Sequence, residues 1–370
     1  MKKVLILTIT AGEGHNSTAK AVQDLLNARG ITCKIIDAYR YVSRLLGSTI
    51  NTGYLFSSKY SPKVYRTGYR MAEKMEHHGF EPKIVSDTQY IISKKLLRHM
   101  REEQYDCVVC THVFAAKMVN AMKLKGYFRG LPTIGIVTDF TIHPFWSEVT
   151  QIEYLLVASE LLANEAERKG ISKSRLLPFG IPINSKFSHR REQREARLEL
   201  GIDPDRYTVL MMGGSMGYGK LDQQIRSLDE LPFDFQILAV CGNNQTLKES
   251  LDEILLSKPL HVYGFVHNVD VMMDAADCIV SKPGGLTTSE ALTKGLPMII
   301  VNPIPGQEER NVEFLMNNQA AVLVSETYPL SDALYQFFVY PQKIDNLRRS
   351  IALINKPDAD ERLADFIEKL

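Results

Sequence analysis

The residues best suited to chemistry lie between Ser281 and Glu290, where a Pro-Gly-Gly turn joins an apolar strand to a short helix. Glycines let the backbone approach a ligand closely, and the N–H groups and positive dipole end of a helix favour an anion. We therefore expect Gly285 and Thr287 to surround a diphosphate. Lys282 either adds positive charge there or only flanks the turn. Glu290 is placed to accept hydrogen bonds from ribose hydroxyls, so the segment predicts a nucleotide site.

Three other segments of the second half carry groups that would complete such a site. The glycine-rich loop 211–219 follows a predicted strand, and its Gly214 and Ser215 can offer N–H and hydroxyl groups to a pyrophosphate. The backbone of Phe265-Val266, after another strand, could read a planar base. The pair Gln307-Glu308 follows a further strand and could reach a sugar. The combination predicts a nucleotide-sugar as the ligand.

The first half places polar side chains after two predicted strands. His15 follows the first strand in a Gly-x-Gly-His loop, and Asp139 and His143 follow a later one. Ligands of open α/β sheets bind at the carboxyl ends of the strands, so His15 or Asp139 could act as a general base, or Asp139 could orient His15. The competing interpretations are a surface histidine and an aspartate that caps a local turn. Trp146, the only tryptophan, could line an acceptor pocket or simply pack.

The composition is that of a globular protein with more than one core. The chain has 370 residues, of which 45% are hydrophobic and 24% charged, and no apolar run is long enough to span a bilayer. Five cysteines, mostly in apolar strand-like runs, favour a reduced cytoplasmic protein. Cys107 and Cys110 have metal-ligand spacing, but on a strand they point to opposite faces, and we expect two core residues.

Strand and helix patterns alternate through both halves, which is typical of doubly wound parallel sheets. The segment 178–184 contains two prolines and a glycine and little charge, and it is the predicted linker. We therefore expect an N-terminal α/β domain over residues 1–184 and a C-terminal one over residues 185–370.

The two predicted domains differ in charge. Residues 1–184 carry 25 Lys and Arg against 16 Asp and Glu, whereas the remainder carries 19 against 27. Between Arg40 and Arg101, 12 basic residues face 4 acidic ones, with many tyrosines among them. Such a stretch suits an anionic membrane surface, although a solvated helical insertion would look the same. The candidate contact residues are Tyr54, Lys59, Lys63, Arg66 and Arg70.

Taken together, these motifs resemble the glycosyltransferases that make glycolipids from UDP-sugars. These are the monogalactosyldiacylglycerol synthases of plants, the processive diacylglycerol glucosyltransferases of bacteria and, more distantly, the N-acetylglucosaminyltransferase of lipid II synthesis. The resemblance covers nearly the whole chain. It rests on Gly12-x-Gly14-His15, Val137-Thr-Asp139, His143-Pro144 with Trp146, Gly180-Ile-Pro182, Gly213-Gly214-Ser215, Cys241-Gly242-Asn243, Lys282-Pro-Gly-Gly285 with Glu290, and Pro305-Gly-Gln307-Glu308.

The resemblance implies a GT-B fold, in which two Rossmann-like domains face each other across a cleft. It further implies an acceptor- and membrane-facing first domain, a UDP-sugar-binding second domain, an inverting mechanism and no obligatory metal. On this resemblance Glu290 would hold the ribose, Gln307 and Glu308 the donor hexose, and His15 would lie near the acceptor hydroxyl. The Phe265-Val266 backbone would meet uracil, and Gly214, Ser215 and Thr287 would surround the diphosphate.

We therefore expect an inverting glycosyltransferase that moves glucose or galactose from a UDP-sugar to diacylglycerol or a glycosyl-diacylglycerol. It would work in the cytoplasm, peripherally on the inner face of the cell membrane, with no cofactor, no metal and no nucleic-acid partner. The alternatives are transfer of N-acetylglucosamine to a lipid-linked peptidoglycan precursor, a nucleotide-sugar epimerase, and a UDP-sugar sensor without turnover. A transferase would release UDP only when an acceptor lipid is present, and a sensor would release none.

Overall fold

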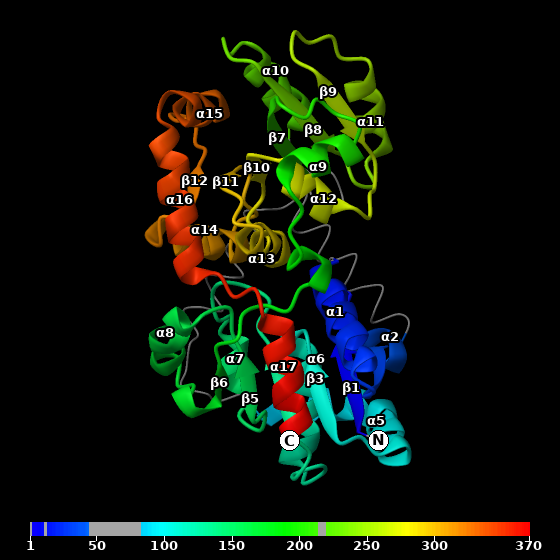
Figure 1. Ribbon diagram of the computed structural model, residues 1–370. Helices are drawn as coiled ribbons and strands as arrows, with labels where there is room; N and C mark the ends of the chain where they lie inside the picture. The colour runs from blue at the N-terminus through cyan, green and yellow to red at the C-terminus, as the bar shows by residue number, and fades with distance from the viewer. Residues whose placement is uncertain (1, 11–12, 44–82, 214–219) are drawn as a thin grey trace. The chain divides into compact units, whose positions relative to one another are not determined.

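The computed structural model describes residues 2–10, 13–43, 83–213 and 220–370. They belong to two compact units (Figure 1). The first unit comprises Met1–Ser185, Pro305–Arg310 and Lys356–Leu370, and the second comprises Lys186–Ile304 and Asn311–Asn355. Each contains a six-stranded parallel sheet with helices between the strands, so the predicted α/β class is confirmed.

The sheet of the first unit has the strand order β2-β1-β3-β4-β5-β6. Its central strands are continuous apolar runs because both of their faces are covered, and Val4, Ile6 and Val109 are fully buried. The strands are β1 Lys3–Thr8, β2 Thr32–Asp37, β3 Cys107–Cys110, β4 Thr133–Ile136, β5 Tyr154–Leu156 and β6 Leu176–Leu177. The α-helices wholly within this unit are α1 Gly14–Ala28, α2 Ala38–Val42, α5 Lys83–Glu103, α6 Val113–Leu124, α7 Phe145–Glu148, α8 Ala163–Arg168 and α17 Ala359–Lys369.

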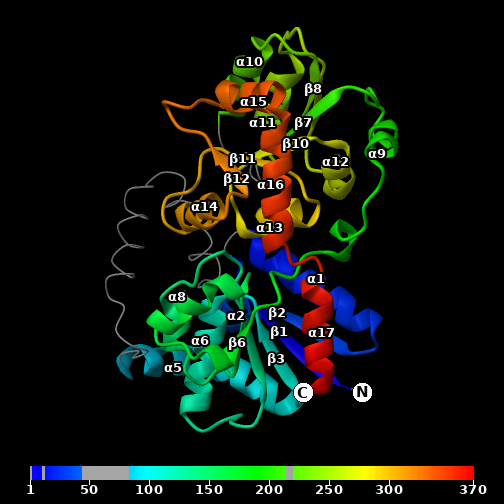
Figure 2. The ribbon, with the colours of Figure 1, turned by 60° about the vertical axis from the view of Figure 1, so that its left-hand side comes forward.

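The C-terminal helix α17 belongs to the first unit, which corrects the predicted C-terminal domain of residues 185–370. Its apolar side chains Leu363 and Ile367 are buried in the same core as β1 and α1, and the helix packs along α1 (Figure 2). Arg29, at the end of α1, adds ion pairs to three acidic residues of α17: Glu361, Asp365 at 2.6 Å and Glu368 at 3.2 Å. The helix returns because its amphipathic face fits this core, a long-range contact that no local pattern reveals.

The sheet of the second unit has the strand order β12-β11-β10-β7-β8-β9. Its core is formed by residues of β7, β8, β10 and β11 together with α10, α15 and α16. The strands are β7 Tyr207–Met212, β8 Phe235–Val240, β9 Leu260–Tyr263, β10 Cys278–Ser281, β11 Met298–Ile300 and β12 Ala321–Leu323. The helices are α9 Gln193–Glu199, α10 Leu221–Asp229, α11 Gln245–Asp252, α12 Val269–Ala275, α13 Gly285–Thr293, α14 Gln307–Asn317, α15 Leu330–Val339 and α16 Pro341–Ile354, with α14 beginning in the segment assigned to the first unit.

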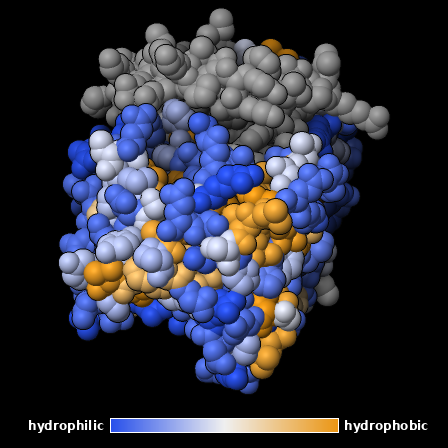
Figure 3. All heavy atoms as spheres, turned by 90° about the horizontal axis from the view of Figure 1, so that it is seen from above, coloured by the Kyte–Doolittle hydropathy of each residue, from blue (hydrophilic) through white to orange (hydrophobic). Residues whose placement is uncertain are grey.

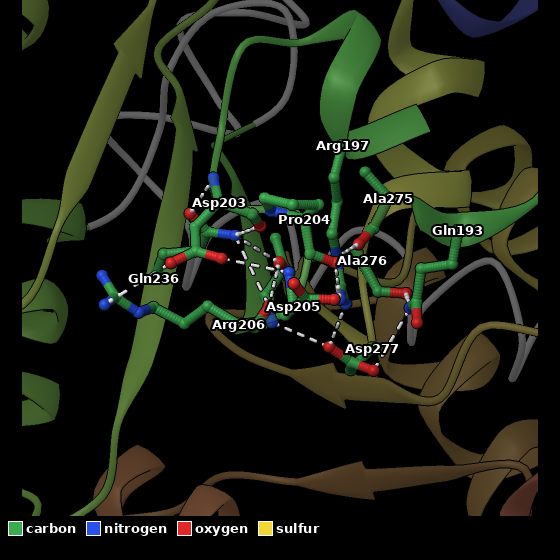
Figure 4. Close-up of polar contacts among 11 residues, drawn as sticks. Gln193, Arg197, Asp203, Pro204, Asp205, Arg206, Gln236, Ala275, Ala276 and Asp277 are labelled. Atoms are coloured by element: carbon green, nitrogen blue, oxygen red, sulfur yellow. Dashed lines mark hydrogen bonds and ion pairs between the residues drawn. The ribbon is translucent and has the colours of Figure 1, made fainter. Parts of the chain in front are cut away.

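A buried guanidinium joins the start of the second unit to its sheet (Figure 4). Arg197 of α9 donates to the carbonyl of Ala275 at 2.9 Å and pairs with the Asp277 carboxylate at 2.7 Å. The same carboxylate accepts from the Thr208 backbone N–H at 2.7 Å. Because the charge is paired and hydrogen-bonded on several sides, it can be buried here, and it fixes α9 against the beginnings of β7 and β10.

Among the described residues, no helix combines the length and apolarity needed to cross a membrane. Large apolar side chains are nevertheless exposed at several places on the second unit, including Leu255, Tyr335, Val339 and Tyr340. Figure 3 shows apolar patches set among hydrophilic residues on the face seen from above.

Candidate functional site

The first unit brings three strand ends together at one edge of its sheet. Strands β1, β3 and β4 are neighbours and run parallel, with Leu7 opposite Cys110 and Cys110 opposite Gly135. The residues that follow these strands therefore meet at the carboxyl edge, where ligands of such sheets bind. They include His15 after β1 and Asp139 after β4, the two predicted candidates for the general base.

His15, in the first turn of α1, is held by a backbone carbonyl. Its Nδ1 lies 2.7 Å from the Thr111 carbonyl oxygen and 3.2 Å from the Thr138 hydroxyl. Because a carbonyl only accepts, Nδ1 carries the hydrogen and Nε2 of the neutral ring keeps a lone pair. Burial lowers the pKa of His15 to about 4, with the Thr111 carbonyl opposing the shift, so the ring is neutral at pH 7. A neutral ring in this tautomer can accept a proton at Nε2.

A second histidine, His112, packs against the first and was not predicted as a site residue. The two ring centroids are 4.4 Å apart at an interplanar angle of 65°. His112 caps α6, because its Nδ1 accepts from the backbone N–H of Phe114 at 3.1 Å. Burial lowers its pKa well below the usual range, and the neighbouring His15 and His143 lower it further. The sequence feature that could have identified His112 is its position two residues after the buried strand β3.

The three other predicted residues that follow β4 are Asp139, His143 and Trp146, and each has its own contacts. Asp139 is half-buried, and its carboxylate accepts a hydrogen bond from the side-chain amide of Gln307 within the first unit. His143 accepts from the Phe145 backbone N–H at 3.2 Å and its ring lies 4.6 Å from that of Phe145. Trp146 is only 4% exposed and packs over Gly135, where a Cβ would meet the indole at 2.4 Å. The structure thus places the tryptophan in the core.

Helix α1 begins at Gly14, directly after Glu13, whose side chain makes no capping hydrogen bond. Asn16 lies in the first turn of the helix and bonds to two hydroxyl groups that follow β1 or end it. It contacts the Thr8 hydroxyl at 3.0 Å and donates to the Thr10 hydroxyl at 3.2 Å. These bonds hold the turn that presents His15.

In the second unit the predicted turn follows β10 and opens α13. Gly284 caps the helix in an extended conformation, and the first intrahelical bond runs from the Thr288 N–H to the Gly284 carbonyl at 2.9 Å. The amides of the first turn, including those of Gly285 and Thr287, therefore precede the hydrogen-bonded part of the helix, as an anion site requires. The fully buried Asn311, which sequence reasoning missed, fixes the turn by donating to the Pro283 carbonyl at 2.8 Å.

Glu290 lies one turn beyond Thr287 on α13. Burial raises the pKa of its carboxyl group to about 8, while the charge of Lys186 lowers it and that of Asp270 raises it. The group is therefore mostly protonated at pH 7 in the free protein. Gly295 follows the end of the helix with a φ of 62°, a left-handed conformation that glycine adopts readily.

The remaining donor-side residues follow other strands. Phe265, after β9, is 55% exposed and its ring stands edge-on to His267 at 5.1 Å, while Val266 is half-buried. Gln307 and Glu308 begin α14 and are both half-buried, as is Lys282 after β10.

Several predicted residues lie outside the described part of the chain. On the donor side these are Gly214 and Ser215, and on the membrane side Tyr54, Lys59, Lys63, Arg66 and Arg70. Within the described ranges, no group of three or more His, Cys, Asp or Glu side chains is arranged to hold a metal ion.

Comparison with known proteins covers both halves of the chain. Residues 15–183 match the family of monogalactosyldiacylglycerol (MGDG) synthase, and residues 208–361 match the glycosyltransferase family 28 C-terminal domain. The processive diacylglycerol beta-glucosyltransferase of Bacillus licheniformis is 26% identical over 374 residues, with 100% of this chain and 95% of the relative covered. Monogalactosyldiacylglycerol synthase 1 of Arabidopsis thaliana is 26% identical over 375 residues, covering 97% of this chain and 69% of the relative.

Among solved structures, MurG of Acinetobacter baumannii superimposes over 100% of both chains with a TM-score of 0.67 and 16% identity, which shows a shared fold. The resemblance inferred from the motifs is therefore confirmed by matches that extend over both units. The chain belongs to the glycosyltransferases of the MGDG synthase and family 28 type and has their GT-B fold.

Proposed function

We propose that this protein is an inverting transferase that moves a hexose, glucose or galactose, from a UDP-sugar to diacylglycerol or a glycosyl-diacylglycerol. The observation that carries the proposal is the full-length match to a processive diacylglycerol beta-glucosyltransferase, supported by MGDG synthase similarity over the first half. The geometry of each unit agrees with it. A neutral imidazole lies at the sheet edge of the first unit, and a helix N-terminus with a carboxyl group lies at that of the second.

The second unit would bind the nucleotide part of the donor. Its diphosphate would lie at the N-terminus of α13, near Gly285 and Thr287, with Lys282 supplying positive charge. Glu290 would take the ribose hydroxyls, and the backbone of Phe265-Val266 would meet uracil. The donor hexose would contact Gln307 and Glu308, and Gly214 and Ser215 would complete the diphosphate site.

In the reaction, the acceptor oxygen forms a bond to the anomeric carbon while the bond from that carbon to the diphosphate oxygen breaks. The leaving UDP takes the electron pair, and the anomeric configuration inverts because attack comes from the opposite face. The hydroxyl proton of the acceptor passes to Nε2 of His15, with Asp139 as the second candidate for the base. Such general-base assistance contributes about 10²–10⁴-fold.

We also propose that the reaction needs no metal or other cofactor. The charge that develops on the diphosphate would be met by the dipole of α13 and by Lys282, which are fixed before the reaction begins.

The test is mass spectrometry of the lipid products after incubation with single UDP-sugars and vesicles that contain diacylglycerol. Hexosyl-diacylglycerol from UDP-glucose or UDP-galactose, with UDP release that depends on the lipid, is the expected result. Product formed only from UDP-N-acetylglucosamine and a lipid-linked peptidoglycan precursor would overturn the acceptor assignment. Donor binding without product or UDP release under any condition would show a sensor instead.

His15→Ala should lower kcat by about 10²-fold or more, because it removes the proton acceptor of the transition state. The affinity for UDP-glucose should be unchanged, since His15 belongs to the first unit. Ser17→Ala, an exposed change on the same helix, is the matched control. Normal turnover by His15→Ala, together with loss of turnover in Asp139→Asn, would assign the base to Asp139.

Glu290→Gln should weaken binding of UDP-glucose by about 1–3 kcal/mol, because it removes charge-assisted hydrogen bonds to the ribose. The free carboxyl group has a pKa of about 8, so binding to its ionised form releases a proton. Wild-type affinity should therefore rise with pH through pH 8 and level off above it, whereas the affinity of the variant should not follow pH. Calorimetry between pH 6 and 8.5 measures both, with the exposed Glu249→Gln as control. Identical profiles for wild type and Glu290→Gln would refute the ribose assignment.

We further propose that the first unit docks on an anionic membrane from the cytoplasmic side. Within the described residues, the outer face of α5 supports this. Ile91 is 61% exposed, and the exposed Lys94, Arg98 and Arg101 follow it at helical spacing on one face. Each such cation near an anionic surface contributes roughly 1 kcal/mol, and salt screens the attraction within about 10 Å.

Reversing two of these charges, Lys94→Glu with Arg98→Glu, should weaken binding to vesicles containing anionic lipid by at least about tenfold. The matched control reverses two exposed arginines of the second unit, Arg226→Glu with Arg349→Glu, so that the net charge change is equal. Co-sedimentation at low and high salt measures the difference. Equal loss in both variants would show only a net-charge effect and would contradict docking through α5.

A further inference from the structure

One lysine of the second unit joins two segments on the donor side. Lys186 lies in the 3-10 turn Ser185–Phe187, directly after the predicted linker. Its ammonium donates to the His267 carbonyl at 2.5 Å and pairs with the Asp270 carboxylate at 3.1 Å. His267 stands edge-on to the Phe265 ring, and Asp270 begins α12. A single cation therefore ties the loop after β9 to the helix that follows it.

The same ammonium acts on the carboxyl group of α13. Burial raises the pKa of Glu290, and of the two charges that act on it Lys186 lowers that pKa while Asp270 raises it. The Asp270 side chain is only 6% exposed and pairs on its other side with Arg191 at 3.1 Å. Lys186 thus bonds to the loop whose backbone would meet the base, and its charge acts on the carboxyl group that would meet the ribose.

The packing of α12 does not depend on Lys186 alone. Asp274 of the same helix pairs with the buried Lys294 at 2.7 Å and with Arg191 at 3.6 Å. Asp270 would keep Arg191 as a partner if Lys186 were lost. The bond to the His267 carbonyl is therefore not explained by charge neutralisation of α12, and it calls for a different role.

We propose that Lys186 is a positioning residue of the donor site, which fixes the loop that carries Phe265 through its bonds to the His267 carbonyl and the Asp270 carboxylate. The inference rests on the proposed function, because base and ribose of one nucleotide must meet this loop and Glu290 at a fixed separation. Lysine suits the role because one compact ammonium can donate to a carbonyl and a carboxylate at once.

The test compares Lys186→Met and Lys186→Arg with the control Arg191→Met in the full chain. Arg191 shares Asp270, whereas the described bond to the His267 carbonyl comes from Lys186, so the Arg191 variant reports the loss of the ion pair alone. Calorimetry with UDP-glucose from pH 6 to 8.5 gives the affinity and its pH dependence. Thermal unfolding of each variant reports its stability.

Lys186→Met should weaken binding about tenfold at pH 7 and move the levelling of affinity to higher pH, because Glu290 then ionises less readily. KM for the UDP-sugar should rise more than kcat falls. Lys186→Arg keeps the charge and should keep the wild-type pH dependence, so it carries the test if Lys186→Met does not fold. Arg191→Met should stay within about twofold of wild type in affinity.

The positioning role would be overturned if Lys186→Met bound UDP-glucose with wild-type affinity and pH dependence. It would also be overturned if Arg191→Met lost as much affinity as Lys186→Met. In either case the donor site would stand. A wild-type protein that binds no UDP-sugar would overturn the donor site itself, and the role of Lys186 with it.

Discussion

The parallel register of three neighbouring strands is the constraint on which the first unit's chemistry depends. Because β1, β3 and β4 end side by side, the Thr111 carbonyl lies where it can hold Nδ1 of His15, and the Thr138 hydroxyl reaches the same atom. Both partners lie about 100 residues or more from His15 in the chain. The tautomer of the ring is therefore a consequence of strand order, and only then of local sequence.

Burial has opposite effects on the two titratable groups that matter most. It lowers the pKa of His15 to about 4 and raises that of Glu290 to about 8, so both are largely uncharged at pH 7 before substrate arrives. A neutral imidazole can take a proton at once. A protonated carboxyl group must lose one to bind a diol as a carboxylate, which makes the charge of nearby Lys186 important. In the proposed site, the charge of the donor is thus left to the dipole of α13 and to Lys282.

The sequence was sufficient for the strands, the turn before α13 and the histidine after β1, because each has a local signature of apolar runs, glycines or a strand end. The sequence was insufficient for contacts between residues that are far apart in the chain. The return of α17 to the first core, the bond from Asn311 to Pro283 and the packing of His112 on His15 join residues far apart in the chain. Among the strands, β6 has only two residues, which is too short for a periodic pattern to identify.

His112, which packs on His15, lies in a cluster of aromatic side chains. The ring centroid of His112 lies 5.3 Å from that of Phe114, which lies 5.7 Å from that of Phe145. The Lys117 ammonium is 4.1 Å from the centroid of the Phe145 ring. Aromatic side chains thus occupy space that water would otherwise fill, and Lys117 can lie among them because Glu148 pairs with it. Loss of hydration is the main cause of the low pKa of His15. The His112 ring, which itself packs on Phe114, therefore contributes to the burial that keeps the imidazole of His15 neutral.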